Sequence, residues 1–366
     1  MRIVVDSDIP FIKGVLEPWF EVTYSNGSQI DNVLAKDATA LLVRTRTRCD
    51  NALLSGSSVK AIFTATIGMD HIDLDYCNSR GIEVFNAAGC NAGGVMQYVI
   101  TAMFEILKIK EEAFKEKKVG IIGAGNVGER IARFLEGTGI EVMRCDPPKS
   151  LLGNGINYYK LDKVLESCDI ISLHVPLDST TRNMCDWDFL QKLKQGSYLI
   201  NTSRGEVVAE QDLLRERSRL GALVLDVWAN EPQINLELMG VCDIATPHIA
   251  GYSYEGKLNA TLFSVRNIGT LFGIKELSGF EIFTDPAPRI AKVEYDGKSP
   301  ESSISKVLSG IYPIMEESLL LKSDPGNFES IRGNYNFRRE FRYDLSVILK
   351  SFLKSSTLYN QQITNT

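Results

Sequence analysis

The most constraining feature of this sequence is a glycine-rich turn, Gly123-Ala-Gly-Asn-Val-Gly128. The run KKVGIIG before it predicts a buried strand, and NVGERIARFLE after it predicts an amphipathic helix. Gly123 allows the tight turn, Gly125 lets the backbone approach a pyrophosphate, and Gly128 lets helix and strand pack closely. Because a helix N-terminus offers unpaired N–H groups and a partial positive charge, the segment predicts a dinucleotide site.

An acidic residue narrows the choice of dinucleotide. Asp146 ends the next predicted strand, EVMRCD, at roughly the 20-residue spacing expected for the acid that accepts the ribose hydroxyls. A carboxylate there repels a 2′-phosphate, so the sequence favours NAD over NADP. The alternative is a chance glycine turn followed by a strand-capping Asp, which the succession of strand, turn, helix and acid disfavours.

The composition limits the class of protein. The 366 residues are 44% hydrophobic, enough for two or three cores. The net charge of -6 argues against a nucleic acid or a membrane as the main partner, because phosphate surfaces favour a basic protein. The start MRIVVD leads straight into a predicted strand, and no 18 apolar residues run together, so we expect a cytoplasmic protein. Seven scattered cysteines without a C-x-x-C pair indicate neither disulfides nor a metal site.

The rhythm of strands and helices predicts two doubly wound parallel-sheet domains. A discontinuous flavodoxin-like substrate domain is expected at residues 1–92 and 253–284, and a Rossmann NAD domain at 93–252. One long helix from Gly93 to Lys110 leads into the second domain, and a helical stretch after Tyr252 leads back to the first. A proline-containing linker then opens a smaller C-terminal α+β domain, residues 285–366, mainly helical with one strand at AKVEYDG.

Reactive side chains follow several strands of the second domain, where ligands bind in an open parallel sheet. Arg204 follows YLINTS, Glu231 follows ALVLDV, and His248 follows DIATP. Taking a hydride from a secondary alcohol needs a base for the hydroxyl proton and a cation for the substrate carboxylate, which His248 and Arg204 supply. Glu231 would orient the imidazole. Any one of these residues could form a loop salt bridge instead, but the three together favour catalysis.

The two other histidines carry less information. His71, in GMDHID, is expected to be a loop or helix-capping residue. His174 ends the predicted strand IISLHVP, so it either contacts the cofactor or has a structural role. Neither is assigned to catalysis.

An arginine-rich run, VRTRTR, is predicted as a strand in the first domain. Side chains alternate along a strand, so Arg44, Arg46 and Arg48 would share one face and the two threonines the other. Arginine binds carboxylate and phosphate well, which makes Arg44 a candidate substrate contact. The alternative is a solvated edge strand protected by charge. In the tail, Arg338 and Arg339 form a weaker second candidate for a phosphate contact.

Four segments in order, GAGNVG, NTSRGEVV, LDVWANEP and TPHIAGYS, resemble the D-2-hydroxyacid dehydrogenase family over residues 1–285. The resemblance implies a catalytic Arg204, Glu231 and His248, with histidine as the acid and base. It also implies an NAD site made of Gly123, Gly125, Asn126, Val127, Gly128, Asp146, Val175, Thr202, Ser203, Arg204, Asp226 and Gly251. Val175 departs from the family, in which threonine is usual; only a contact through the hydroxyl would be lost.

Four further segments, LLVRTRTRCD, TATIGMDHID, NAAGCNAGGVMQYV and SIRGNYNFRREF, resemble a branch of the family that oxidises a phosphorylated sugar acid in bacterial vitamin B6 biosynthesis. This resemblance implies that Thr45, Thr66 and Tyr252 contact the substrate and that the tail forms a homodimer.

Two alternatives to this branch stay open at this point. One is another dehydrogenase of the family, acting on 3-phosphoglycerate or on an unphosphorylated acid such as lactate. The other is a non-enzymatic NAD(H)-sensing protein on the same fold. A sensor would have no need of Arg204, Glu231 and His248 together.

Overall fold

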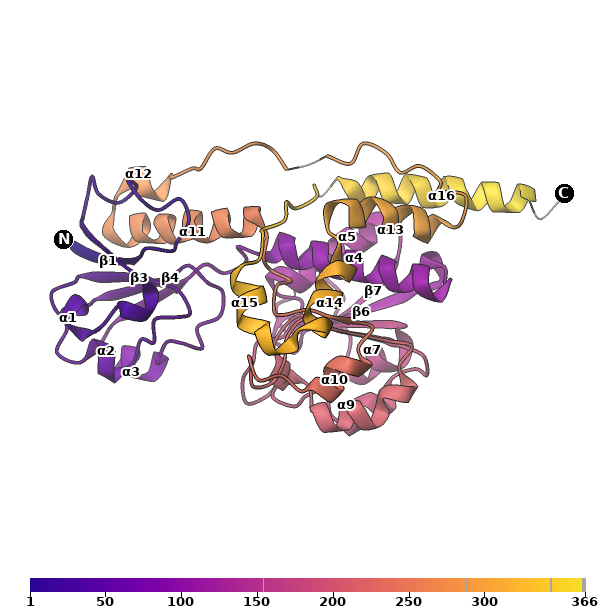
Figure 1. Cartoon of the computed structure of the whole chain (residues 1–366), viewed down its shortest axis with the longest axis horizontal. Helices are drawn as coiled ribbons and strands as arrows, with labels where there is room; N and C mark the ends of the chain where they lie inside the picture. Colours follow the sequence, from indigo (N-terminus) through magenta and orange to yellow (C-terminus); the bar gives the residue numbers. More distant parts are fainter. Residues whose placement is uncertain (154, 288, 343, 364–366) are drawn as a thin grey trace. The chain divides into compact units, whose positions relative to one another are not determined.

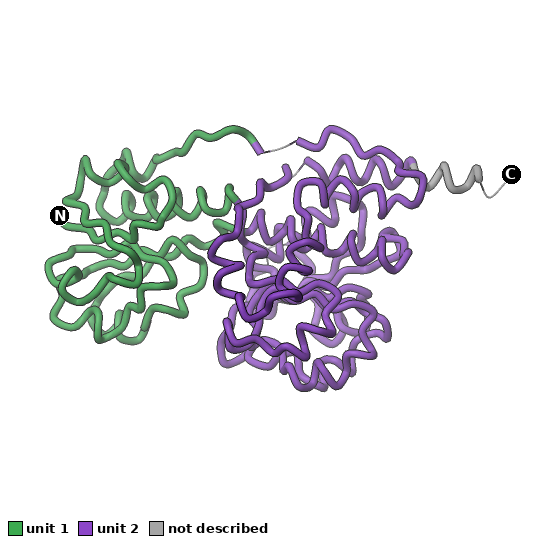
Figure 2. Tube along the Cα trace, viewed as in Figure 1, with its two compact units in different colours: residues 1–91, 254–286 green, residues 92–253, 287–366 purple. Residues whose placement is uncertain are grey.

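The computed structural model describes residues 1–153, 155–287, 289–342 and 344–363, with side chains up to residue 355. The chain forms two compact units (Figure 2). The first comprises Met1–Asn91 and Tyr254–Pro286, and the second comprises Ala92–Ser253 and Ala287–Thr366. The first unit is therefore discontinuous in sequence.

The first unit is built on a five-stranded parallel sheet in the order β2-β1-β3-β4-β5, which is the flavodoxin-like order. Its strands are β1 (Arg2–Asp6), β2 (Glu21–Ser25), β3 (Ala40–Val43), β4 (Ala61–Thr64) and β5 (Glu83–Asn86). Its helices are α1 (Asn32–Ala35), α2 (Asn51–Leu54), α3 (Leu74–Ser79), α11 (Tyr254–Phe272) and α12 (Lys275–Ser278). The strands β3 and β4 are fully buried and apolar except for Thr64, as expected of strands covered on both faces.

Helix α11 is the predicted return to the first unit. Its buried residues Val265 and Ile268 pack with Phe63 of β4 and Ile3 of β1 in one core. That burial attaches the helix to the first sheet, although it lies far from that sheet in sequence.

The second unit is built on a six-stranded parallel sheet in the order β11-β10-β9-β8-β6-β7. Its strands are β6 (Lys118–Ile122), β7 (Glu141–Cys145), β8 (Ile170–Leu173), β9 (Tyr198–Asn201), β10 (Ala222–Leu225) and β11 (Ile244–Ala245). Its helices before residue 253 are α4 (Ala92–Lys110), α5 (Asn126–Thr138), α6 (Pro147–Ser150), α7 (Leu161–Ser167), α8 (Trp187–Lys192), α9 (Glu210–Glu216) and α10 (Leu236–Val241). Helices lie on both faces of this sheet (Figure 1), and two apolar cores fill the layers between the helices and the strands.

Helix α4 is long and apolar enough to cross a membrane by length and composition. Its most apolar stretch is 89% buried inside the structure, where Met96, Tyr98 and Phe104 contribute to a core. Its apolar surface is therefore used in packing. All seven cysteines of the chain are buried as well.

The C-terminal segment, residues 287–366, falls in the same compact unit as residues 92–253, whereas the sequence suggested a domain of its own. It contains α13 (Pro300–Ile311), α14 (Ile314–Ser323), α15 (Phe328–Gly333) and α16 (Leu345–Ile363). Ile304 and Leu308 join the core around α4, and Phe328 joins the core on the other side of the sheet. The segment therefore shares its cores with the six-stranded sheet.

The strand predicted at AKVEYDG is wrong, because residues 291–297 form no strand. Val293 alone in this run is buried, and it packs into the core that contains α13. One buried side chain fixes the run in place without a ladder of backbone hydrogen bonds. The segment is helical where it is regular.

Candidate active site

The glycine turn connects β6 to α5, and its three glycines have different surroundings. Gly123 has a positive φ of 87°, and a Cβ there would lie 2.7 Å from the backbone of His174. A Cβ on Gly128 would lie 2.0 Å from the Gly123 oxygen, so both positions need glycine for packing. A Cβ on Gly125 would meet no atom within 4 Å. The second glycine thus leaves an open face at the N-terminus of α5, as a dinucleotide pyrophosphate requires.

Asp146 lies beside this turn. One carboxylate oxygen accepts a hydrogen bond from the Lys149 amide at 3.0 Å and caps the short helix α6, and the other accepts one from the Ala124 amide at 2.9 Å. The carboxylate is half-buried. It occupies the place in the second unit where an acid can accept ribose hydroxyls.

Two more predicted positions, His174 and Val175, follow β8. The His174 imidazole lies 2.8 Å from the Ser172 hydroxyl and 3.3 Å from the Thr202 hydroxyl. Burial lowers the pKa of His174 to about 3, so the ring is neutral near pH 7. A neutral, buried and hydrogen-bonded ring favours a structural role for His174 over a contact with the cofactor. The half-buried side chain of Val175 packs against the apolar core, and its backbone lies next to Gly123.

Asp226 follows β10, and its carboxylate organises the loop that carries His248. One of its oxygens accepts from the Thr246 hydroxyl at 2.6 Å and the Ile249 amide at 2.8 Å, and the other from the Ala250 amide at 2.9 Å. Burial raises the pKa of Asp226 despite these bonds and the nearby histidine. The Asp226 carbonyl also accepts from the His248 amide at 2.7 Å. These bonds hold His248 in a left-handed conformation, with φ of 57°.

Glu231 and His248 form a hydrogen-bonded pair. His248 Nδ1 lies 2.8 Å from Glu231 Oε2, and Glu231 Oε1 accepts from the Trp228 amide at 3.0 Å. Burial raises the pKa of Glu231, but the hydrogen bond and charge of His248 outweigh it, and the pKa is lowered. A carboxylate at Nδ1 favours the tautomer with its proton on that nitrogen, which leaves Nε2 to exchange a proton. The imidazole is 29% exposed, so a small molecule can reach it.

Arg204 follows β9 and lies half-buried. Its guanidinium donates to the Ser203 carbonyl at 2.7 Å, and its own carbonyl accepts from the Asn201 side chain at 2.9 Å. A Cβ on the next residue, Gly205, would lie 1.9 Å from the Trp228 backbone. Arg204 is thus carried by a loop packed against the segment that leads to Glu231.

The remaining candidates for the cofactor site belong to the same strand-end loops. Asn201 Oδ1 accepts from the amide and the hydroxyl of the buried Ser203, and Thr202 contacts His174. Gly251 is half-buried and follows the loop held by Asp226. Asn126 and Val127 open α5. Their contacts with a cofactor stay predictions.

The arginine-rich run of the first unit is not a strand, which corrects the expected alternation. β3 ends at Val43, and a turn follows in which the Thr47 amide donates to the Arg44 carbonyl at 3.1 Å. Thr47 is buried, and its hydroxyl donates to the Gly27 carbonyl at 2.8 Å. That contact turns the chain inward, so the three arginines do not share a strand face. Arg44 pairs with Asp6 at 3.0 Å and Asp8 at 2.9 Å.

The threonine candidates of the first unit differ in exposure. Thr45 is exposed on the turn after β3. The Thr66 hydroxyl lies 2.6 Å from that of Thr64 and donates to the Gly68 carbonyl at 2.9 Å. His71 lies in a turn, as expected, 3.2 Å from the Thr64 hydroxyl, and burial lowers its pKa.

The C-terminal segment brings two arginines to the Tyr252 region. Arg338 is buried, and its guanidinium donates to the carbonyls of Ile249, Tyr252 and Gly94, so the predicted phosphate contact through Arg338 is wrong. Arg332, which the sequence did not single out, donates to the Tyr252 hydroxyl at 3.0 Å.

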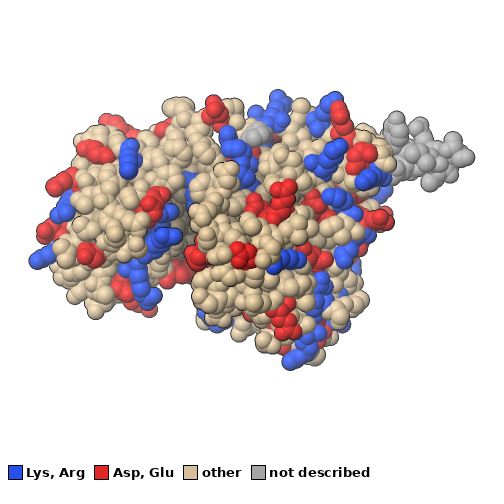
Figure 3. All heavy atoms as spheres, in the orientation of Figure 1, with Lys and Arg blue, Asp and Glu red and all other residues tan. Residues whose placement is uncertain are grey.

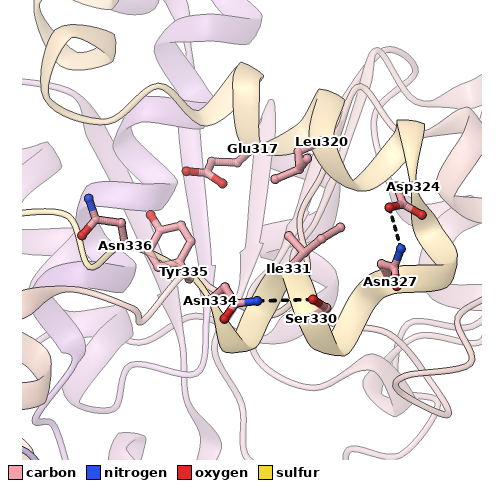
Figure 4. Close-up of a pocket in the computed structure, with 9 residues that line it drawn as sticks. All are labelled: Glu317, Leu320, Asp324, Asn327, Ser330, Ile331, Asn334, Tyr335 and Asn336. Carbon is pink, nitrogen blue, oxygen red and sulfur yellow. Dashed lines mark hydrogen bonds between the residues drawn. The ribbon is translucent and has the colours of Figure 1, made fainter.

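A pocket of about 360 Å³ in the same segment is lined by residues between Glu317 and Asn336 (Figure 4). None of the candidate catalytic residues lines it.

Comparisons with known proteins identify the family. Residues 101–250 match the family described as D-isomer specific 2-hydroxyacid dehydrogenase, NAD binding domain. The chain is 42% identical over 351 residues to an erythronate-4-phosphate dehydrogenase of Bacteroides fragilis, covering 93% of this chain and 97% of that protein.

Two solved structures resemble this fold. One is a D-lactate dehydrogenase from Aquifex aeolicus complexed with NAD and lactic acid, with 27% identity, a TM-score of 0.63, and coverage of 75% of this chain and 97% of that chain. The other is an NAD-bound 3-phosphoglycerate dehydrogenase from Entamoeba histolytica, with 27% identity, a TM-score of 0.64, and coverage of 78% and 99%.

Proposed function

The chain belongs to the D-isomer specific 2-hydroxyacid dehydrogenase family, and from this premise we propose that it oxidises 4-phospho-D-erythronate with NAD. The product is (R)-3-hydroxy-2-oxo-4-phosphooxybutanoate, in a step of vitamin B6 biosynthesis. The single observation that carries the proposal is the Glu231–His248 pair, 2.8 Å apart, in the unit that also holds the glycine turn. The similarity to erythronate-4-phosphate dehydrogenases over 93% of the chain supports the choice of substrate.

Proton transfer at C2 is assigned to His248. Its Nε2 takes the proton from the substrate hydroxyl, and Glu231 at Nδ1 stabilises the imidazolium that forms. The Arg204 guanidinium binds the substrate carboxylate and stabilises the carbonyl oxygen as it develops. When bound, NAD supplies the hydride acceptor. In the reverse direction the imidazolium returns its proton to the carbonyl oxygen.

The residues proposed to hold NAD lie on the glycine turn, on Asp146 and on the loops after β8, β9 and β10. Gly125 offers the open face for the pyrophosphate, and Asp146 offers oxygens to the ribose. The others are Gly123, Asn126, Val127, Gly128, Val175, Thr202, Ser203, Arg204, Asp226 and Gly251.

The substrate contacts are proposed residue by residue. The family resemblance implies contacts with the phosphorylated acid at Thr45, Thr66 and Tyr252. The arginine-rich run adds Arg44. Arg44 is already paired with two carboxylates, Asp6 and Asp8. A phosphate would therefore share this arginine with them.

A substrate panel tests the function. Nicotinamide absorbance is followed with 4-phospho-D-erythronate, 3-phosphoglycerate and D-lactate at equal concentrations. We expect kcat/KM for 4-phospho-D-erythronate to exceed the other two by roughly 100-fold or more, because an acid without a matching phosphate loses charge-assisted bonds. Equal or better turnover of either comparison acid would refute the assignment.

We also propose a cytoplasmic homodimer formed through the C-terminal segment. Truncating that segment would strip buried residues such as Ile304 and Phe328 from two cores, so the test uses the full chain. Sedimentation velocity should give twice the 40.7 kDa chain mass. Sedimentation as a monomer at micromolar concentration would reject the dimer.

A further inference from the structure

A second charged side chain approaches the Glu231–His248 pair, and it comes from the C-terminal segment. Arg332 lies on α15, which is anchored by Phe328 at 1% exposure and lies beside α14 (Figure 4). One guanidinium nitrogen of Arg332 lies 3.8 Å from Glu231 Oε2. The same oxygen lies 2.8 Å from His248 Nδ1. One carboxylate oxygen is thus shared between the imidazole and an arginine.

Arg332 also fixes a candidate substrate contact. Its Nε donates to the Tyr252 hydroxyl at 3.0 Å, and the guanidinium carbon lies 5.7 Å from the centre of the Tyr252 ring. Tyr335 and Phe337 pack edge-on against the same ring, each at 6.0 Å between centroids. The orientation of Tyr252 is therefore set by three side chains of the C-terminal segment.

The backbone between His248 and Tyr252 is held from the same side. Arg338 donates to the carbonyls of Ile249 and Tyr252 at 3.1 and 3.0 Å, and Ser253 pairs with Arg338 in an isolated β-bridge. A buried guanidinium with this many acceptors has one position. The C-terminal segment thus holds both ends of the stretch from Ile249, which directly follows His248, to Tyr252.

We propose that the C-terminal segment completes the active site within its own chain, with Arg332 as a positioning residue that orients Tyr252 and neutralises part of the Glu231 charge facing His248. The inference deepens the proposed function and rests on the roles given there to His248, Glu231 and Tyr252.

The charges around His248 give the proposal a measurable sign. Within the described part of the second unit, Glu231 faces Nδ1, Asp226 holds the adjacent amides, Arg332 faces Glu231, and the buried Arg338 lies next to the loop. Removing the positive charge of Arg332 leaves the carboxylates less compensated. His248 should then take up its proton at a higher pH. Its proton affinity should rise roughly threefold, because Arg332 faces Glu231 and not His248 itself, and because the site is partly solvated.

The test is an NMR titration of the full chain labelled on histidine, without substrate or cofactor. The chain has only three histidines, and burial lowers the pKa of both His71 and His174. The His248 signal is assigned by its loss in His248→Gln. We expect Arg332→Gln to raise the midpoint of this signal by about half a pH unit. The matched control is Arg342→Gln, an exposed arginine of the same segment paired with Asp344, which should leave the midpoint in place.

An unchanged midpoint in a folded Arg332→Gln variant would overturn the electrostatic part of the proposal. Because this titration needs no turnover, its failure is distinguishable from failure of the proposed function.

A second variant, Arg332→Lys, tests the orienting part and keeps the proposal falsifiable if Arg332→Gln does not fold. Lysine keeps the charge but loses the guanidinium geometry at Tyr252. We expect KM for 4-phospho-D-erythronate to rise roughly fivefold to tenfold, as in Tyr252→Phe, with the His248 midpoint near that of the wild type. A KM equal to that of the wild type in both variants would overturn the orienting role.

Discussion

The buried carboxylate of Asp226 holds the loop that carries His248, and its substitution tests that role. Asp226→Asn keeps the shape of the side chain but replaces one of its two oxygens with an NH₂ group. Asp226 is 1% exposed, and its two oxygens accept three hydrogen bonds, two of them from the amides of Ile249 and Ala250. An NH₂ group in either place faces an N–H donor, so at least one bond becomes a repulsive contact.

The size of the effect follows from these bonds. A hydrogen bond to a buried charged group contributes about 1.5 to 3 kcal/mol, and an unpaired donor adds its desolvation cost. Asparagine is uncharged, so Asp226→Asn also removes the cost of burying a carboxylate, the same cost that raises the pKa of Asp226. This gain offsets part of the lost hydrogen-bond energy. We expect Asp226→Asn to destabilise the second unit by about 2 to 4 kcal/mol, a fall in Tm of about 5 to 15 °C.

The same change should displace His248, because the amides of the next two residues, Ile249 and Ala250, donate to the altered side chain and His248 itself is held at a φ of 57°. A shift of about 1 Å at a catalytic group lowers kcat by roughly 100-fold. Calorimetry gives Tm, and the absorbance assay gives kcat. The matched control is Asp186→Asn, because Asp186 caps α8 and asparagine caps a helix equally well. A Tm within about 2 °C of the wild type and an unchanged kcat for Asp226→Asn would refute the role of this carboxylate.

Two other predictions use the glycine turn and the Glu231–His248 pair. The methyl group of Gly125→Ala enters open space at the face proposed for the pyrophosphate. We therefore expect Tm to change little, while the NAD affinity measured by calorimetry falls at least tenfold. The methyl group of Gly128→Ala would meet the Gly123 oxygen, so this variant should lower Tm by several degrees. Equal effects of the two substitutions on Tm would contradict this. Burial raises the pKa of Glu231, but the His248 bond lowers it overall, so its stabilisation is present above the ordinary carboxyl pKa and lost as pH falls through the lowered value. The Tm difference between the wild type and Glu231→Gln should therefore shrink as the pH falls below the ordinary carboxyl value of 4.5; a constant difference would show that Glu231 does not titrate this way.

The elements that build the cofactor site could be predicted from sequence because their signals are local. The glycine turn, the strand before it and the helix after it lie within one continuous segment, in which Gly123 and Gly128 have no room for a Cβ and Gly125 leaves an open face. The long helices α4 and α11 were predicted for the same reason, since their apolar periodicity runs over many turns.

The errors concern short alternating segments. In VRTRTR the alternation of arginine and threonine suggested a strand, but a buried hydrogen bond from Thr47 ends it at Val43. AKVEYDG alternates too, and it has no partner strand. The strand β2, residues Glu21–Ser25, was missed because a half-buried edge strand with mixed polarity carries a weak pattern. Pairing across the sheet decides such cases, and pairing is not local.

Arg332 could not be found from sequence, because its contact with Tyr252 joins residues 80 positions apart. The sequence predicted a helical run around Arg332, and α15 is such a helix, but a helical pattern does not say which distant residue a given position contacts. In contrast, Glu231 and His248 each follow a strong apolar strand of one sheet, and the rule that strand ends meet at one edge brings them together.

The central claim is that His248, oriented by Glu231, transfers the proton in an NAD-dependent oxidation. The most direct test compares His248→Gln with the wild type in two measurements, calorimetric NAD binding and kcat with 4-phospho-D-erythronate. Glutamine keeps a polar side chain but cannot act as a base near neutral pH. We expect NAD affinity within about twofold of the wild type and a kcat lower by roughly 1,000-fold or more. A variant that binds NAD normally and retains near-normal kcat would contradict the account.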